Sequence, residues 1–64
     1  MEPYQERVVA EKKELDDRLS KLVAFIGGTV FLALPAAEQI RLADQSHAMQ
    51  QYSDILGQRI AAFK

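Results

Sequence analysis

Apolar residues recur every three, four or seven positions in the first part of the chain. This spacing places side chains on one face of an α-helix. The residues of this stripe are Tyr4, Val8, Leu15, Leu19, Leu22 and Ile26. Pro3 suits a first helical turn, because its missing N–H would have no helical partner there. The pattern therefore predicts a helix from about Pro3 to Ile26.

A second apolar stripe predicts a second helix from Pro35 to about Phe63. Its residues lie at heptad intervals or beside them: Leu42, Met49, Leu56 and Phe63, widened by Ala48, Tyr52, Ile55 and Ile60. Pro35 is expected to open this helix. Glu38 would then lie near its positive N-terminal end, where a carboxylate is stabilising.

Residues 27–34 lie between the two stripes and predict a short corner. Gly27 and Gly28 are expected to end the first helix, with glycine in the left-handed cap conformation. Thr29 is expected to cap a short turn through residues 30–32. No run of useful length alternates between apolar and polar residues, so strands are not expected. The predicted fold is all-α: an antiparallel two-helix hairpin with a short corner, forming one domain over residues 1–64.

A hairpin of this size has too small a core to be stable alone. A chain of 64 residues buries only about 60% of its unfolded surface. Small domains rely on disulfides, a metal or partners, but this chain has no cysteine and a single histidine, His47, which we interpret as a surface residue. Both apolar stripes also span about 120–140° of the helical wheel, which is wider than the narrow seam between two helices requires. We therefore expect a homo-oligomer.

Several functional classes are disfavoured. A net charge of −1 provides no broad cationic surface for a DNA or RNA polymer. The uncharged run from Leu22 to Ala37 has 16 residues, whereas a membrane span needs about 20, and Pro35 interrupts it. We expect no membrane partner and no signal peptide, although a small membrane-active protein remains an alternative. No phosphate loop or catalytic constellation is present, so we expect no enzyme and no cofactor.

Polar residues interrupt both stripes at heptad spacing. Glu11 and Arg18 share the register of Tyr4 and Phe25, and Gln45 and Arg59 fall in the arc of Tyr52 and Leu56. Because buried charge is costly unless paired, these residues need partners. One interpretation is an ion pair, such as Glu11 with Arg18 or Arg59 of another copy. The other is a site for a planar anionic ligand, since guanidinium groups bind phosphate and stack on rings.

The distance between two of these residues limits the second interpretation. Tyr4 and Arg18 are 14 residues apart, which is about 21 Å along an unbroken helix. One chain therefore cannot bring both to the same small ligand. Two chains packed antiparallel can, so a pocket that uses both residues would lie at a subunit interface.

Two sets of residues carry a family resemblance. They are Tyr4 to Val9, Glu11 to Leu15, Lys21-Leu22 and Phe25-Ile26 in the first helix, and Leu42, Gln45, Met49, Tyr52, Ile55-Leu56 and Arg59-Ile60 in the second. This order resembles the phage hairpin-domain sponges, typified by the anti-CBASS cyclic-oligonucleotide sponge and the related Thoeris anti-defence sponge. The resemblance implies a hexamer of hairpins, built from interlocked trimers, in the cytoplasm of the infected bacterial host.

The resemblance also implies a function and two sites. Such proteins capture immune messengers without cleaving them, including cyclic GMP–AMP, cyclic tri-adenylate and cyclised ADP-ribose isomers. Tyr4 and Arg18 match the residues of a cyclic dinucleotide site, with arginine where lysine is expected. Ser20 and Arg59 match those of a separate cyclic trinucleotide site. The alternative function is a structural or adaptor coiled-coil oligomer without a small-molecule ligand.

Overall fold

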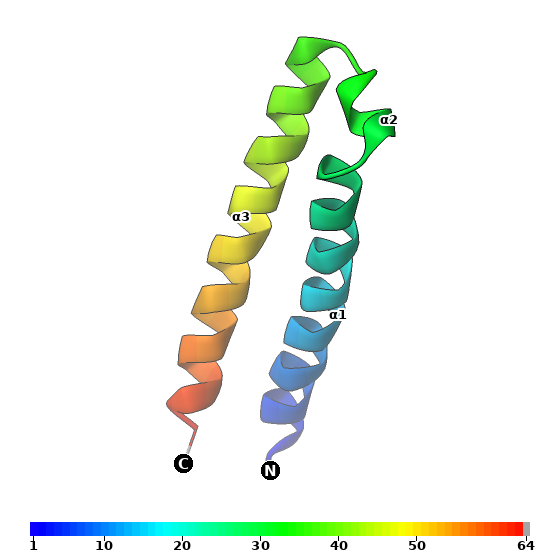
Figure 1. The fold of residues 1–64 in the computed structure, drawn as a ribbon. Coiled ribbons are helices and arrows are strands. Elements are labelled where there is room, and N and C mark those ends of the chain that lie inside the picture. The colour runs from blue at the N-terminus through cyan, green and yellow to red at the C-terminus, as the bar shows by residue number, and fades with distance from the viewer. Residues whose placement is uncertain (64) are drawn as a thin grey trace.

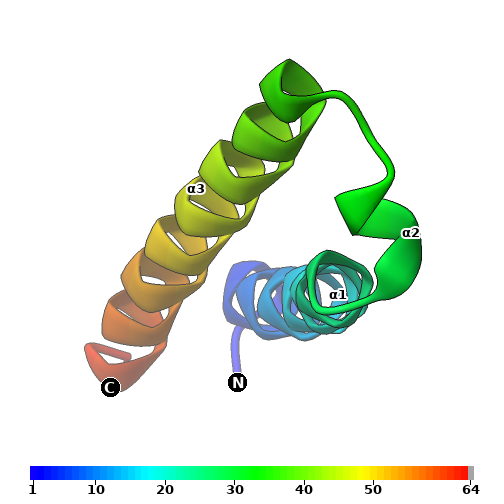
Figure 2. The same ribbon diagram turned by 45° about the horizontal axis from the view of Figure 1, so that its top comes forward.

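The structure is a computed structural model that describes residues 1–63, and it is a helical hairpin (Figure 1). Helix α1 spans Pro3–Ile26, the short helix α2 spans Thr29–Leu32, and helix α3 spans Ala36–Ala61. The two long helices run antiparallel, with both chain ends together and α2 at the opposite end. Figure 2 shows α2 beside the end of α1, before the chain crosses to the start of α3. The predicted all-α hairpin is confirmed.

A single heptad seam joins α1 to α3. Most of the buried and half-buried residues of each long helix recur alternately every three and four positions, which keeps them on one face. We define the seam by these residues: Gln5, Val8, Lys12, Leu15, Leu19, Leu22 and Ile26 of α1, and Gln39, Leu42, Ser46, Met49, Ser53, Leu56, Ile60 and Phe63 at the α3 side. The centre of the core is small. Val8 and Leu15 surround the fully buried Leu56, and Met49, Ile60 and Phe63 pack against them.

Polar groups determine where the helices begin and how the corner is held. The side chain of Gln5 accepts a hydrogen bond of 2.8 Å from the backbone N–H of Glu2, just before α1. At the corner, the Gln39 side chain donates to the carbonyl oxygens of Leu34 (2.9 Å) and Leu32 (3.3 Å). Pro35 is the N-cap of α3. These bonds satisfy backbone groups that helix ends leave without partners.

Two expectations about the corner are wrong in detail. Gly27 does end α1, but its φ of −78° and ψ of −2° are right-handed, and no described glycine has a positive φ. A tight right-handed last turn, in which the Gly28 N–H donates to the Phe25 carbonyl oxygen three residues earlier, replaces the left-handed cap. Thr29 is the first residue of α2, not its cap. Gly28 occupies the N-cap position without a side-chain hydrogen bond.

Many large apolar side chains remain in contact with water. Tyr4 is 51% exposed and Tyr52 is 42% exposed, although both were expected in the apolar stripes. Val30, Leu32 and Ile40 are exposed around the corner. Within residues 1–63, no helix combines the length and apolar character that crossing a membrane demands. One chain therefore covers only the seam side of each helix.

Leu56→Ala should lower the free energy of unfolding by about 2–5 kcal/mol, because it opens a cavity at the centre of the core. The matched control is Leu32→Ala, which removes the same atoms from a side chain that is 72% exposed and should cost much less. Urea unfolding followed by circular dichroism measures both. Equal losses for the two variants would contradict the position of the core.

Candidate functional site

A groove of about 450 Å³ opens on one side of the seam, between α1 and α3. Polar side chains from both helices line it together with two apolar ones. The residues of the groove are Lys12, Asp16, Leu19, Ser20, Val23, Gln50, Ser53 and Asp54. The groove is therefore a place where groups from both helices can reach one small molecule.

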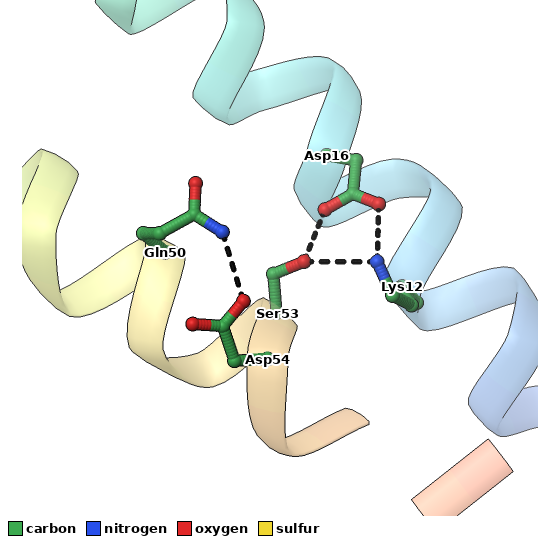
Figure 3. A network of polar contacts seen from close by, with 5 residues as sticks. All are labelled: Lys12, Asp16, Gln50, Ser53 and Asp54. Carbon is green, nitrogen blue, oxygen red and sulfur yellow. Dashed lines mark hydrogen bonds and ion pairs between the residues drawn. The ribbon is translucent and has the colours of Figure 1, made fainter. Parts of the chain in front are cut away.

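Three of these residues form a hydrogen-bonded triangle across the seam (Figure 3). The Lys12 ammonium donates to Asp16 Oδ2 at 2.7 Å and to Ser53 Oγ at 3.0 Å. Ser53 Oγ in turn donates to Asp16 Oδ1 at 2.5 Å. The Lys12 stem passes beside Gly57, where an added Cβ would lie 3.4 Å from Lys12 Cε, at the limit of ordinary contact. The triangle thus places a lysine and a serine at seam positions where apolar residues would otherwise pack.

The triangle acts on the acidity of one carboxyl group. The hydrogen bond from Lys12, and then the one from Ser53, lowers the pKa of Asp16 below its ordinary value. Both bonds favour the charged form of the carboxylate. Asp54, on the other helix, accepts a hydrogen bond of 3.0 Å from Gln50.

The charge of the groove disfavours anions. Among its lining residues Lys12 is the one cation, and there are two carboxylates, Asp16 and Asp54. The Lys12 ammonium is also already paired with Asp16. An anionic ligand would have to displace that pair and approach a second carboxylate. The groove therefore suits a neutral or cationic group better than a phosphate.

A different surface lies on the other side of the seam. On α1 it consists of the residues that directly precede every second seam residue: Tyr4, Glu11, Arg18 and Phe25. On α3 the corresponding residues are Gln45, Tyr52 and Arg59. We call these two sets of residues the α1 row and the α3 row. In an antiparallel helix pair these two rows flank the same side of the seam, whereas Asp16, Val23 and Gln50 of the groove flank the other. We call these seven residues the aromatic–arginine face. All seven are exposed.

The charged residues of this face have no partners within the part of the chain that is described. The ion pairs among residues 1–63 are Lys12–Asp16 and Glu38–Arg41, and neither involves a residue of this face. Glu14 lies four residues before Arg18 but forms no ion pair with it. Glu11, Arg18, Gln45 and Arg59 are exposed in a single chain, so the shelter and partners that the sequence predicts for them would have to come from other copies. The seam excludes them because it follows the neighbouring heptad positions.

The structure separates the members of each predicted site. Tyr4 and Arg18 share the aromatic–arginine face but stay about 21 Å apart along α1. The Tyr4 ring packs edge-on against Phe63, with the ring centroids 5.9 Å apart. Ser20 lines the groove, whereas Arg59 lies on the opposite face of the hairpin. Neither pair can hold one small ligand within a single chain.

Sequence reasoning missed the triangle of Lys12, Asp16 and Ser53. A signal for it existed, because Lys12 falls at seam spacing between Val8 and Leu15. Reading the alternating three- and four-residue spacing strictly would have placed this lysine against α3. For metal binding, residues 1–63 bring together no cluster of three or more histidine, cysteine, aspartate or glutamate side chains.

Asp16→Asn should make the free energy of unfolding depend less on pH in the acid range. The lowered pKa means that Asp16 stabilises the fold above its unfolded pKa of about 3.9, and that this contribution is lost as pH falls through the folded pKa. The free energy of unfolding from urea titrations at pH 7 down to pH 2 should therefore fall less in the variant. Asp17→Asn, at an exposed neighbour with no hydrogen bond among the described residues, should keep the steeper profile. A D16N profile as steep as the wild-type profile would contradict the role of the triangle.

Comparison with known proteins identifies relatives for nearly the whole chain. A model of the Sequestin family matches residues 2–62. The chain is also 38% identical, over 61 residues and 95% of both chains, to an uncharacterised 7.5 kDa protein from the denB–rIIB intergenic region of Enterobacteria phage T4. No solved structure matches. The chain therefore belongs to the Sequestin family and has a phage relative of nearly its own length.

Proposed function

We propose that this protein is a phage anti-defence protein that binds and sequesters cyclic oligonucleotide messengers without cleaving them. Membership of a family named for sequestration supports the binding role, and the relative from phage T4 supports the phage context. The role requires a site that holds an anion and a base, and it requires no catalytic group. Its setting would be the cytoplasm of the infected host.

The observation that carries the proposal is the composition of the aromatic–arginine face. Arg18 and Arg59 are exposed there and form no ion pair among the described residues. Tyr4 and Tyr52 expose much of their rings beside them. A guanidinium group can hold a phosphate through two parallel hydrogen bonds, and a tyrosine ring can stack on a base for about 1–3 kcal/mol. The same face thus offers both parts of a nucleotide.

The electrostatics favour this face over the groove. A cyclic dinucleotide carries two negative charges, and the groove presents two carboxylates to it. The aromatic–arginine face presents two arginines and one carboxylate, Glu11. We therefore assign the cyclic dinucleotide site to Tyr4 and Arg18, contributed by different copies of the chain in a homo-oligomer such as a hexamer.

Ser20 and Arg59 are proposed for cyclic trinucleotides such as cyclic tri-adenylate. Because they lie on opposite faces of one hairpin, they too would have to come from different copies. The Arg59 guanidinium of the second copy would then have to supply the positive charge that the groove beside Ser20 lacks. This assignment makes the two kinds of site separable by mutation.

Arg18→Ala should raise the Kd for cyclic GMP–AMP about 10- to 100-fold, since a hydrogen bond to a charged group contributes about 1.5–3 kcal/mol. Isothermal titration calorimetry of the purified protein measures this. Heating the complex should return intact nucleotide, detected by chromatography. Lys13→Ala removes a charge from the same helix, outside the aromatic–arginine face, and should leave the Kd unchanged.

The proposal would be contradicted if calorimetry detected no binding to any member of a panel of cyclic di- and trinucleotides and cyclised ADP-ribose isomers. An equal loss of affinity in K13A and R18A would contradict the assignment of the site. In the first case, an intact oligomer without a ligand would favour the second candidate function, a coiled-coil adaptor. The exposed heptad spacing of the aromatic–arginine face is the observation that favours that candidate.

Arg59→Ala and Ser20→Ala should each weaken binding of cyclic tri-adenylate while leaving cyclic GMP–AMP affinity within about twofold of wild type. The same calorimetric titrations provide the comparison. Parallel losses for both ligands would show that one shared site, not two, is in use.

A further inference from the structure

The polar groups of the groove divide into a set that is paired internally and a set that can contact a ligand. Within the triangle, both carboxylate oxygens of Asp16 accept hydrogen bonds and the Ser53 hydroxyl donates its proton. The polar residues of the groove outside the triangle are Ser20, Gln50 and Asp54, and all three are exposed. A molecule in the groove would therefore meet these three side chains.

Gln50 and Asp54 form a pair in which the carboxylate fixes the amide. They lie one turn apart on α3, and Gln50 Nε2 donates to Asp54 Oδ1 at 3.0 Å. Figure 3 shows this bond leaving Nε2 on the side away from Gln50 Oε1. A carboxylate only accepts hydrogen bonds, so turning the amide over would set Oε1 against a negatively charged oxygen. Asp54 therefore holds the amide so that Oε1 and the second N–H of Nε2 lie side by side.

An amide held in this way matches one edge of adenine. Its oxygen accepts from the N6 amine and its N–H donates to N7, the bidentate pairing by which glutamine recognises adenine in nucleic acids. Hypoxanthine has O6 in place of the N6 amine, and it would place two acceptors against each other. A glutamine without a carboxylate neighbour could turn over to suit either base, whereas Asp54 prevents Gln50 from doing so. The pair thus selects for the amine.

The rest of the groove suits a flat, uncharged ring. Leu19 is buried and Val23 is 55% exposed, so together they offer an apolar surface for the face of a base. The volume of about 450 Å³ lies in the range of about 300–1,000 Å³ that small-molecule sites have. The two carboxylates disfavour a phosphate in the groove but do not repel a neutral base.

We propose that the groove binds an adenine base of a cyclic trinucleotide, with Gln50 recognising its N6 and N7 atoms and Asp54 orienting Gln50. This proposal rests on the proposed function, which assigns cyclic trinucleotides to Ser20 and Arg59. Ser20 lines the same groove, so its hydroxyl can contact the sugar–phosphate that carries the base. The base then enters the groove while the phosphates stay with the Arg59 guanidinium of another copy. This division removes the conflict between an anionic ligand and an acidic groove.

Exchanging one functional group of the ligand tests the proposal. Isothermal titration calorimetry compares cyclic tri-adenylate with cyclic tri-inosinate, which has the same sugars and phosphates but hypoxanthine bases. The wild-type protein should bind the adenine ligand at least about tenfold more tightly, the discrimination that one bidentate base contact provides. Gln50→Ala should bring the ratio of the two Kd values close to one. Gln51→Ala, at an exposed neighbour outside the groove, should keep the wild-type ratio.

Two further substitutions test the geometry. Gln50→Arg should shift the preference toward cyclic tri-inosinate, because arginine donates to both O6 and N7. Asp54→Asn keeps the shape of the side chain but can donate or accept, so the Gln50 amide can turn over and the ratio should fall toward one. Asp54→Glu keeps a carboxylate and should retain the preference for adenine. Loss of the charge alone would change both affinities together and leave their ratio as it was.

Equal wild-type affinities for the two ligands would overturn the proposal and leave trinucleotide sequestration standing. A ratio that Q50A, Q50R or D54N leaves unchanged would overturn it as well, as would the same fall in Q50A and Q51A. Binding of neither ligand would instead show that the proposed trinucleotide function fails, and the inference with it. Circular dichroism of each variant verifies that the helices are intact.

Discussion

The packing of α1 against α3 along one heptad seam is the contact on which the rest of the structure depends. No disulfide reinforces it, because the chain has no cysteine. Leu56 is the only fully buried large side chain among the described residues. A seam this narrow holds two helices together but covers only one stripe of each. The exposed rings, arginines and corner apolar residues follow directly from that constraint.

The seam contains a polar triangle at a position that a larger apolar core could have filled. A half-exposed ion pair adds little stability, so we assign Lys12 and Asp16 an effect on specificity. Sliding α3 by one heptad in one direction would place Ile60 where Ser53 lies and leave the Lys12 ammonium against an apolar side chain, whereas sliding it in the other direction would place Ser46 there. Polar groups at seam positions fix register in this way in other helix pairs. In this chain, register decides which residues of α1 and α3 share a face.

The two sides of the seam consequently differ in charge. On one side, the groove has two carboxylates and a lysine that is already paired. On the other, Arg18 and Arg59 lie among tyrosines with Glu11 as the single acid. This difference in charge is why the proposed anion site is assigned to the second side.

The sequence predicted the two long helices and their antiparallel pairing, because heptad spacing and the Gly27-Gly28 and Pro35 breaks are local signals. It did not separate the seam from its flanking row. Tyr4 and Val8 lie close enough on a helical wheel to look like one stripe, and only the opposing helix decides that Gln5, not Tyr4, faces inward. The triangle joins Lys12 and Asp16 to Ser53, which is 37 residues beyond Asp16, and it was missed for the same reason.

Native mass spectrometry of the purified protein with a panel of cyclic nucleotides tests the central claim most directly. The account predicts a homo-oligomer carrying intact nucleotide at a fixed ratio of ligand to chains, and a monomer without ligand would contradict it.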